Sequence, residues 1–261
     1  RNPGLALPLI ALQYHEVKFN FQFSSVANIF SGDSTTVFDS KAGDDDADPA
    51  TGAAAGTVNS IKMFVDYVYL DTEERRRFAQ QSHEYLIEQV QEESWSSSDK
   101  TLNFNHPVKE LIWAQDFHPI EAASTRTALN DGALQALDVT DTWQLKLNGH
   151  DRFAAQNTKY FTRVQVMEHH TGPGGIKMQD SVDFNAAADT TLSCVGSLND
   201  SIAVYSFALK PEEHQPSGTC NFSRIDNAVL DSEAGETVTV YAVNYNVLRI
   251  MSGMGGLAYS N

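Results

Sequence analysis

The chain has 261 residues, of which 41% are hydrophobic and 20% are charged, a composition typical of a globular protein and not of a disordered or collagen-like one. Eighteen Lys and Arg against thirty-four Asp and Glu give a net charge of −16, so a phosphate backbone is repelled and nucleic-acid binding is not expected. The apolar run Gly4–Leu12 is interrupted by Pro8 and falls short of the roughly 20 residues that span a bilayer, so no membrane-spanning segment is expected. Two cysteines, Cys194 and Cys220, are too few for a disulfide framework, and two free buried thiols are predicted.

The first element is an alternating segment, Val17–Phe23, which predicts a half-buried strand. Residues 24–60 then lose periodicity and contain the acidic run Asp44–Asp48, which predicts a long acidic surface loop or linker. A calcium site is the less favoured interpretation, because the run lacks the alternating ligands and the closing Glu of an EF-hand loop.

Alternation resumes over Ile61–Tyr69, which predicts the first strand of the next domain. Asp71 and the acidic residues after Thr72 are typical of a helix N-terminus, so a short helix is predicted to about Ser82. This helix carries three consecutive arginines, Arg75, Arg76 and Arg77. They are expected either to face solvent or pair with nearby glutamates, or to form a subunit contact.

Short apolar stretches with turn-rich spacers follow, at Glu84–Gln91, Thr101–Asn105, Val108–Phe117, Trp143–Leu147, Ser201–Lys210 and Thr237–Met251. This pattern predicts an all-β protein, a jelly-roll β-sandwich with short helices in its loops. Lys159–Glu168 fits a short helix or a strand, and Val164 and Val166 favour the strand. The polar stretch Gly172–Asp200 predicts a second long loop.

None of the eight histidines stands in a pattern that predicts a metal or catalytic site. His169 and His170 are adjacent, so in a strand they point to opposite faces, and the chain has no His-x-His motif of a cupin-like metal site. The chain also lacks a Gly-x-Ser-x-Gly elbow and a Walker loop. No catalytic residue, metal or cofactor is therefore expected, although carboxylate pairs of the glycosidase kind stay open.

Two sequons, Asn199-Asp200-Ser201 and Asn221-Phe222-Ser223, make Asn199 and Asn221 candidate N-glycosylation sites. Asn199 is favoured, because Asn221 lies in a segment that is expected to be structurally committed.

Several longer stretches resemble the major capsid proteins of nucleocytoplasmic large double-stranded DNA viruses, particularly those that infect algae. The resemblance rests on Gly4–Val17, Tyr67–Arg77, Asn148–Phe153, Tyr205–Ala228 and Tyr241–Asn261.

The resemblance implies a fold of two consecutive jelly rolls, with three chains forming a pseudo-hexameric capsomer of an icosahedral virion shell. Because this sequence is too short for both jelly rolls, it is expected to be the C-terminal part of a longer protein. Residues 1–23 are then the end of a truncated first jelly roll, residues 24–60 an acidic linker, and residues 61–261 the second jelly roll.

The partners that the resemblance implies are the chain itself as a homotrimer, neighbouring capsomers and minor capsid proteins. An internal lipid membrane lies nearby without being a partner, and no nucleic acid or cofactor is implied. The chain is expected in the capsid, assembled in the infected host cell. The alternative is a lectin-like, carbohydrate-binding jelly roll, in which acidic loops and exposed aromatics such as Trp95 bind sugar or calcium.

Overall fold

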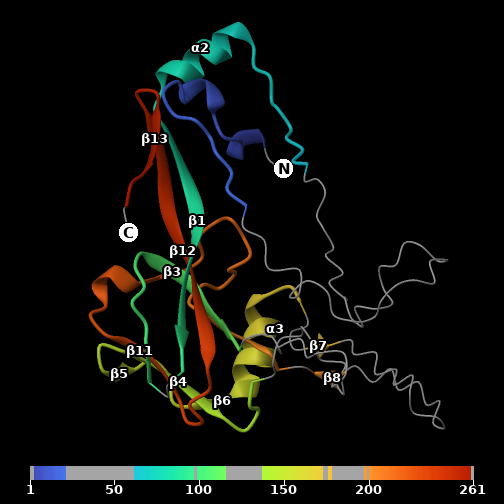
Figure 1. Ribbon diagram of the computed structural model, residues 1–261, viewed down its shortest axis with the longest axis vertical. Helices are drawn as coiled ribbons and strands as arrows, with labels where there is room; N and C mark the ends of the chain where they lie inside the picture. The colour runs from blue at the N-terminus through green and yellow to red at the C-terminus, as the bar shows by residue number, and fades with distance from the viewer. Residues whose placement is uncertain are drawn as a thin grey trace, which may run out of the picture. The chain divides into compact units, whose positions relative to one another are not determined.

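The computed structural model describes residues 3–21, 62–96, 99–115, 137–172, 176–177, 197–198 and 200–259 (Figure 1). They belong to two compact units. The sandwich unit comprises residues 1–17, 70–116 and 135–261, and the second unit comprises residues 18–69 and 117–134. Both β-sheets of the sandwich lie in the first of these units.

The larger sheet of the described residues is antiparallel and is organised around β12 (Val238–Met251). β12 pairs along its whole length with β1 (His83–Trp95), and its other edge pairs with β3 (Pro107–Ala114) and β13 (Met254–Leu257). β3 in turn pairs with β9 (Ile202–Ser206) and β10 (Cys220–Asn221).

The smaller sheet is centred on β11 (Ala228–Ser232), which pairs with β2 (Asp99–Thr101) and β4 (Thr142–Leu147). β4 also pairs with the short strands β5 (His150–Asp151) and β6 (Gln156–Asn157). A separate two-residue pair joins β7 (Ile176–Lys177) to β8 (Ser197–Leu198).

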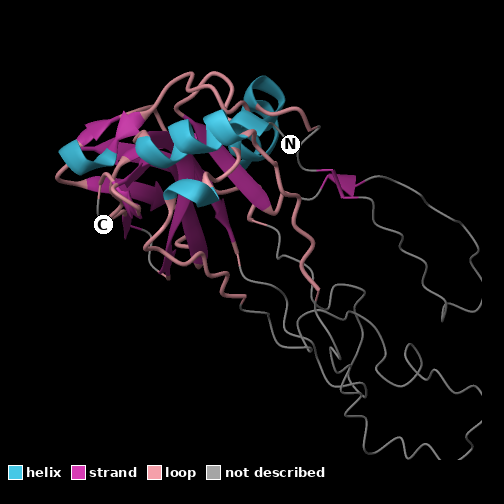
Figure 2. Ribbon diagram, turned by 90° about the horizontal axis from the view of Figure 1, so that it is seen from above, coloured by secondary structure: helices cyan, strands magenta, loops and turns pink. Residues whose placement is uncertain are grey.

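The strand orders β1-β12-β3-β9 and β2-β11-β4 place segments from opposite ends of the chain side by side, as the Greek-key connections of a jelly roll do. The predicted all-β jelly-roll sandwich is therefore confirmed. Figure 2 shows the strands of the two larger sheets gathered in one block, with the short helices beside it and the β7–β8 pair apart from it.

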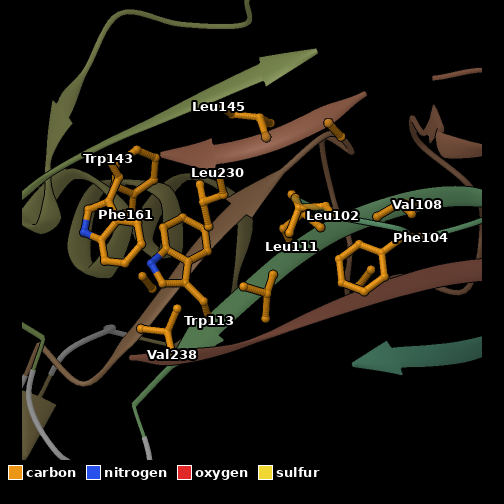
Figure 3. Packing of buried hydrophobic residues seen from close by; sticks show 14 of the residues in the cluster. Leu102, Phe104, Val108, Leu111, Trp113, Trp143, Leu145, Phe161, Leu230 and Val238 are labelled. Atoms are coloured by element: carbon orange, nitrogen blue, oxygen red, sulfur yellow. The ribbon is translucent and has the colours of Figure 1, made fainter. Parts of the chain in front are cut away.

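The core lies between the two sheets (Figure 3). Every second residue at the start of β12 is buried, at Val238, Val240 and Ala242, because alternate side chains of a strand point to the same face. The two fully buried indoles, Trp113 from β3 and Trp143 from β4, meet across the sandwich.

The helices of the sandwich unit are short. They are η1 (Pro3–Leu5), η2 (Leu9–Ala11), α2 (Thr72–Gln80), the π-helical turn η4 (Tyr160–Val164), α3 (Gln165–His169) and η5 (Phe222–Arg224). In Figure 1, α2 and the β12–β13 turn lie at the end of the unit that is opposite β4, β5 and β6.

The strand that Val164 and Val166 favoured over Lys159–Glu168 is wrong, because this segment forms η4 and α3. Its buried residues are Phe161, Thr162 and Gln165, a spacing that belongs to one face of a helix and not to the alternation of a strand. Burial of the Phe161 ring against Trp113, with centroids 5.1 Å apart, decides the conformation over the β preference of two valines.

The alternating segments Val17–Phe23 and Ile61–Tyr69 are also not strands where the structure describes them, at residues 17–21 and 62–69. A strand needs a backbone partner to complete its ladder, and the structure assigns neither segment to a sheet. Side-chain alternation alone therefore did not specify strand pairing.

The remaining strand predictions are confirmed in outline, except that β2 ends at Thr101 and most of Thr101–Asn105 is irregular. The short strands β5, β6, β7, β8, β10, β11 and β13 were missed. The loop predicted at residues 24–60 and the residues 173–175, 178–196 and 199 of the second predicted loop lie outside the described residues.

Candidate assembly interface

The arginine-bearing helix α2 is held at its N-terminus by Asp71. The Asp71 side chain accepts a hydrogen bond from the Thr72 amide at 2.6 Å, and the Asp71 backbone carbonyl accepts one from the Arg75 amide at 2.8 Å. The predicted N-cap is thus confirmed, and the helix ends at Gln80, close to the expected position.

The three arginines all lie on the exposed surface of α2. Arg76 pairs with Glu73 at 3.4 Å, between side chains that are 64% and 77% exposed, so this contact adds little to stability. The Arg75 and Arg77 side chains form no ion pair with any described residue. The structure therefore leaves three exposed arginines on α2, beside the exposed glutamates of its first turn.

An apolar surface adjoins this helix. The N-terminal segment packs against the β12–β13 turn, where the Tyr14 amide donates to the Gly253 carbonyl at 2.9 Å, and η2 lies against α2. Large hydrophobic side chains stay exposed on the segment and on the turn, at Leu5, Leu7, Leu9, Tyr14, Met251, Met254, Leu257 and Tyr259. We call these eight residues the hairpin surface. The apolar residues of this surface follow no core periodicity in the sequence. The sequence analysis did not identify the surface.

Of the two candidate glycosylation sites, Asn199 lies outside the described residues. Asn221 is exposed, and its side-chain oxygen accepts a hydrogen bond from the Ser223 amide at 3.1 Å. The Ser223 hydroxyl in turn accepts from the His106 amide at 2.9 Å. Asn221 is thus accessible, but its sequon is also part of the local fold.

Trp95 was expected to be an exposed aromatic, and this is wrong. Trp95 is half-buried and packs against the core, because β1 places it opposite the buried Val238 of β12. The lectin-like alternative therefore loses the aromatic residue that was named as its example of a sugar contact.

Cys220 is a free, half-buried thiol, and burial raises the pKa of that thiol. Cys194 lies outside the described residues. In the part of the chain that the structure describes, no group of three or more His, Cys, Asp or Glu side chains is placed to hold a metal ion. No described helix has the length and hydropathy that crossing a bilayer requires.

The described fold defines the chain as a jelly-roll protein, and comparison with known proteins identifies which kind. The family model of the large eukaryotic DNA virus major capsid protein matches residues 74–178 and 192–256, and that of the major capsid protein N-terminus matches residues 1–71. The chain therefore belongs to the family of major capsid proteins of large eukaryotic DNA viruses, which are structural proteins of the virion shell.

Relatives with curated sequences agree over the whole chain. The major capsid protein of Pyramimonas orientalis virus is 51% identical across 100% of this chain, and that of Paramecium bursaria Chlorella virus 1 is 38% identical across 100%. The chain spans 59% and 64% of the lengths of these two relatives.

A solved structure supports the fold as well. The crystal structure of PBCV-1 VP54, fitted into a reconstruction of the virophage Sputnik, superposes with a TM-score of 0.54 at 35% identity. The superposition covers 75% of this chain and 56% of that one.

Proposed function

We propose that this chain builds a virion shell by self-association into homotrimeric, pseudo-hexameric capsomers that tile an icosahedral capsid. The observation that carries the proposal is the 51% identity, over the whole chain, to the major capsid protein of Pyramimonas orientalis virus. A sandwich of two sheets around a core of interlocking indole and phenyl rings supplies a stiff block, which suits a protein whose work is assembly.

The proposal includes a division of the chain into domains. Residues 61–261 form the second jelly roll, residues 24–60 an acidic linker, and residues 1–23 the end of a first jelly roll. Within residues 18–69, the described residues carry large apolar side chains without forming a sheet. Phe64 is 90% and Tyr69 91% exposed, and surfaces of this kind mark contacts with another part of a protein.

Arg75, Arg76 and Arg77 are the proposed subunit contact. A second copy of this chain carries a net charge of −16, so it offers many carboxylates to the exposed guanidinium groups, of which only that of Arg76 has an ion-pair partner within the described residues. Contacts with neighbouring capsomers and minor capsid proteins belong to the same proposal. An internal membrane is expected nearby without direct contact, and nucleic acid is not expected as a partner.

The test is the native mass of the full-length protein that contains this chain, measured by light scattering and by native mass spectrometry. The proposal expects a trimer, and a stable monomer would contradict it. The full-length protein is the right sample because the hairpin surface and the second unit expose apolar side chains in the chain by itself.

The role of the arginines is tested in the same protein. Arg75→Glu and Arg77→Glu are expected to reduce the trimer fraction, because each replaces an attraction across the contact by a repulsion. Arg224→Glu is the matched control, since Arg224 is also an exposed arginine in a short helix, η5. Intact trimers in both α2 variants would remove the arginines from the interface while leaving trimer formation itself standing.

A further inference from the structure

His170 lies between two carboxylates. It follows the last residue of α3, and its Nε2 lies 3.1 Å from Glu110 Oε2 on β3. Its Nδ1 lies 3.1 Å from Glu212 Oε1, in the segment that follows β9. One imidazole therefore joins three parts of the sandwich unit that are far apart in the sequence.

The neighbours of His170 fasten the same two segments together. The Thr171 hydroxyl donates to Glu212 at 2.6 Å, and the Thr171 amide lies 3.2 Å from both oxygens of that carboxylate. On the other side, His169 Nδ1 lies 3.1 Å from the Leu209 carbonyl oxygen. Residues 169–171 and 209–212 thus form a clasp, with His170 as its centre.

The contact between Glu110 and His170 is unusual because it lacks a well-aligned hydrogen bond. Glu110 Oε2 and His170 Nε2 are both buried, and neither has an aligned partner among the described residues, although the two atoms are only 3.1 Å apart. A carboxylate oxygen accepts and a bare ring nitrogen also accepts, so these two atoms repel each other unless a proton lies between them. A neutral imidazole has one N–H, so it can donate to one of the two carboxylates but leaves its bare nitrogen facing the other. Both contacts are satisfied when one further proton is present, either on an imidazolium that donates to both carboxylates or on a neutral Glu110 carboxyl group that donates to Nε2.

The other charged groups around Glu110 do not remove this need. Lys109, the bulged residue beside it on β3, binds Glu88 Oε1 on β1 at 2.8 Å and the Pro211 carbonyl at 2.7 Å. The Lys109 ammonium also lies 5.6 Å from the ring centre of Tyr245 on β12. Two carboxylates, Glu88 and Glu212, and one ammonium therefore face the pair of Glu110 and His170, and burial is the largest cause that raises the pKa of Glu110.

We propose that Glu110, His170 and Glu212 form a proton-dependent clasp, which is closed when one proton is shared by Glu110 and His170 and loosens when that proton leaves. Closure fixes the end of α3 to residues 209–212. The inference is independent of trimer formation, because every group in it belongs to one chain.

The direction of the pH dependence follows from the two glutamates. Burial, opposed by His170 and Lys109, raises the pKa of Glu110 above the ordinary value of 4.5, so its contribution is present at low pH and is lost as the pH rises through the raised value. Hydrogen bonds from Thr171 lower the pKa of Glu212 below 4.5, so its contribution is present at higher pH and is lost as the pH falls through the lowered value. The clasp is therefore most closed at mildly acidic pH and loosens on both sides.

The experiment is amide hydrogen exchange of residues 166–171, followed by mass spectrometry and corrected for the intrinsic pH dependence of exchange. The His170 amide is a direct reporter, because it donates to the Val166 carbonyl at 2.8 Å in the last turn of α3. Between about pH 5.5 and pH 8 we expect protection to fall about tenfold, as the proton shared by Glu110 and His170 is lost.

Two variants decide the cause. Glu110→Gln supplies an N–H to a neutral imidazole at Nε2 and leaves Nδ1–H for Glu212, so protection should persist at the alkaline end. The His170→Gln variant should show protection that does not change with pH. The His214→Gln variant changes an exposed histidine of the adjoining loop and should behave as the wild type. Wild-type protection that does not change with pH would overturn the proposal. A Glu110→Gln variant whose protection falls with rising pH as in the wild type would also overturn the proposal. Because this substitution is nearly isosteric, it provides the test even if the His170→Gln variant does not fold.

Discussion

Trp113 of β3 and Trp143 of β4 meet across the sandwich, with ring centroids 5.4 Å apart and planes inclined at 47°. Both side chains are fully buried. They differ in one respect, because Trp143 Nε1 donates to Thr158 Oγ1 at 3.1 Å, whereas Trp113 Nε1 has no partner among the described residues. The pair thus joins the two sheets by packing, and Trp143 adds a hydrogen bond.

Replacing either indole should destabilise the sandwich. Trp113→Ala and Trp143→Ala are each expected to lower the free energy of unfolding by about 3–5 kcal/mol, because each leaves a large cavity in the core. Trp143→Phe should be worse than Trp113→Phe by about 1 kcal/mol, the net worth of the lost hydrogen bond. Urea denaturation measures all four, and Val90→Ala, at a side chain that is 64% exposed, is the control. Equal losses for the two Phe variants would show that the Thr158 bond adds nothing.

A buried carboxylate predicts an acid-sensitive contribution to stability. Asp200 is 3% exposed and accepts hydrogen bonds from Arg163 Nε at 2.9 Å, Arg163 Nη2 at 2.6 Å and Thr162 Oγ1 at 2.5 Å. Burial opposes ionisation, but these bonds outweigh it and lower the pKa of Asp200 below the ordinary 3.8. The contribution is therefore present above the ordinary value and is lost as the pH falls through the lowered one.

Asp200→Asn should lower the free energy of unfolding at neutral pH by about 1.5–3 kcal/mol, the worth of a hydrogen bond to a charged group. The difference from the wild type should shrink as the medium becomes strongly acidic, because the wild-type carboxylate is then protonated. Thermal denaturation across this pH range measures the effect, with the exposed Asp226→Asn as the control. A constant difference at every pH would contradict the assignment.

The sequence predicted those elements whose local signal agrees with their packing. β12 alternates between buried and half-exposed residues over its first half, and α2 begins at the capping Asp71, so both were found. Over Lys159–Glu168 the local signal failed, because the ring of Phe161 packs in the core and imposes a helical face. β11 was missed because its buried face, Ala228, Leu230 and Ser232, includes a polar residue, and its half-exposed Val229 is apolar, so the sequence does not alternate as the burial does.

The candidate interface and the clasp also differ in how far the sequence could predict them. The arginines of α2 are neighbours in the sequence, so the sequence sufficed to group them. Glu110, His170 and Glu212 are brought together by the crossing of β3, α3 and the segment after β9, and no spacing in the sequence encodes that crossing. The sequence analysis placed His169 and His170 on opposite sides of a strand, whereas they lie at the end of a helix.

The half-buried thiol of Cys220 predicts slow modification. Because the thiolate is the reactive form and burial raises the pKa of Cys220, we expect a disulfide reagent to label this residue more slowly than a free cysteine at the same pH. The measurement is made in the Cys194→Ser background, so that one thiol reports. Unfolding in urea should restore the ordinary rate, and a folded protein that reacts as fast as free cysteine would contradict the burial.

Gly253 fixes how the N-terminal segment meets the β12–β13 turn. Its backbone has φ +83°, which side chains disfavour, and a Cβ at this position would lie 2.5 Å from Cδ2 of Tyr14. Gly253→Ala is therefore expected to displace Tyr14 and to lower stability by about 1–3 kcal/mol through backbone strain alone. Gly256→Ala is the matched control in the same hairpin, because a Cβ there meets no atom within 4 Å and its φ is not positive.

Limited proteolysis distinguishes the two variants directly. Because the Tyr14 amide bonds to the Gly253 carbonyl, loss of that contact should expose residues 8–15 to cleavage in Gly253→Ala but not in Gly256→Ala. Faster cleavage of this segment, with the rest of the sandwich still resistant, would show that the N-terminal segment docks through the turn and not through the sheets. Equal cleavage of both variants would instead mean that Leu12, which packs near Gly255, holds the segment without help from Tyr14.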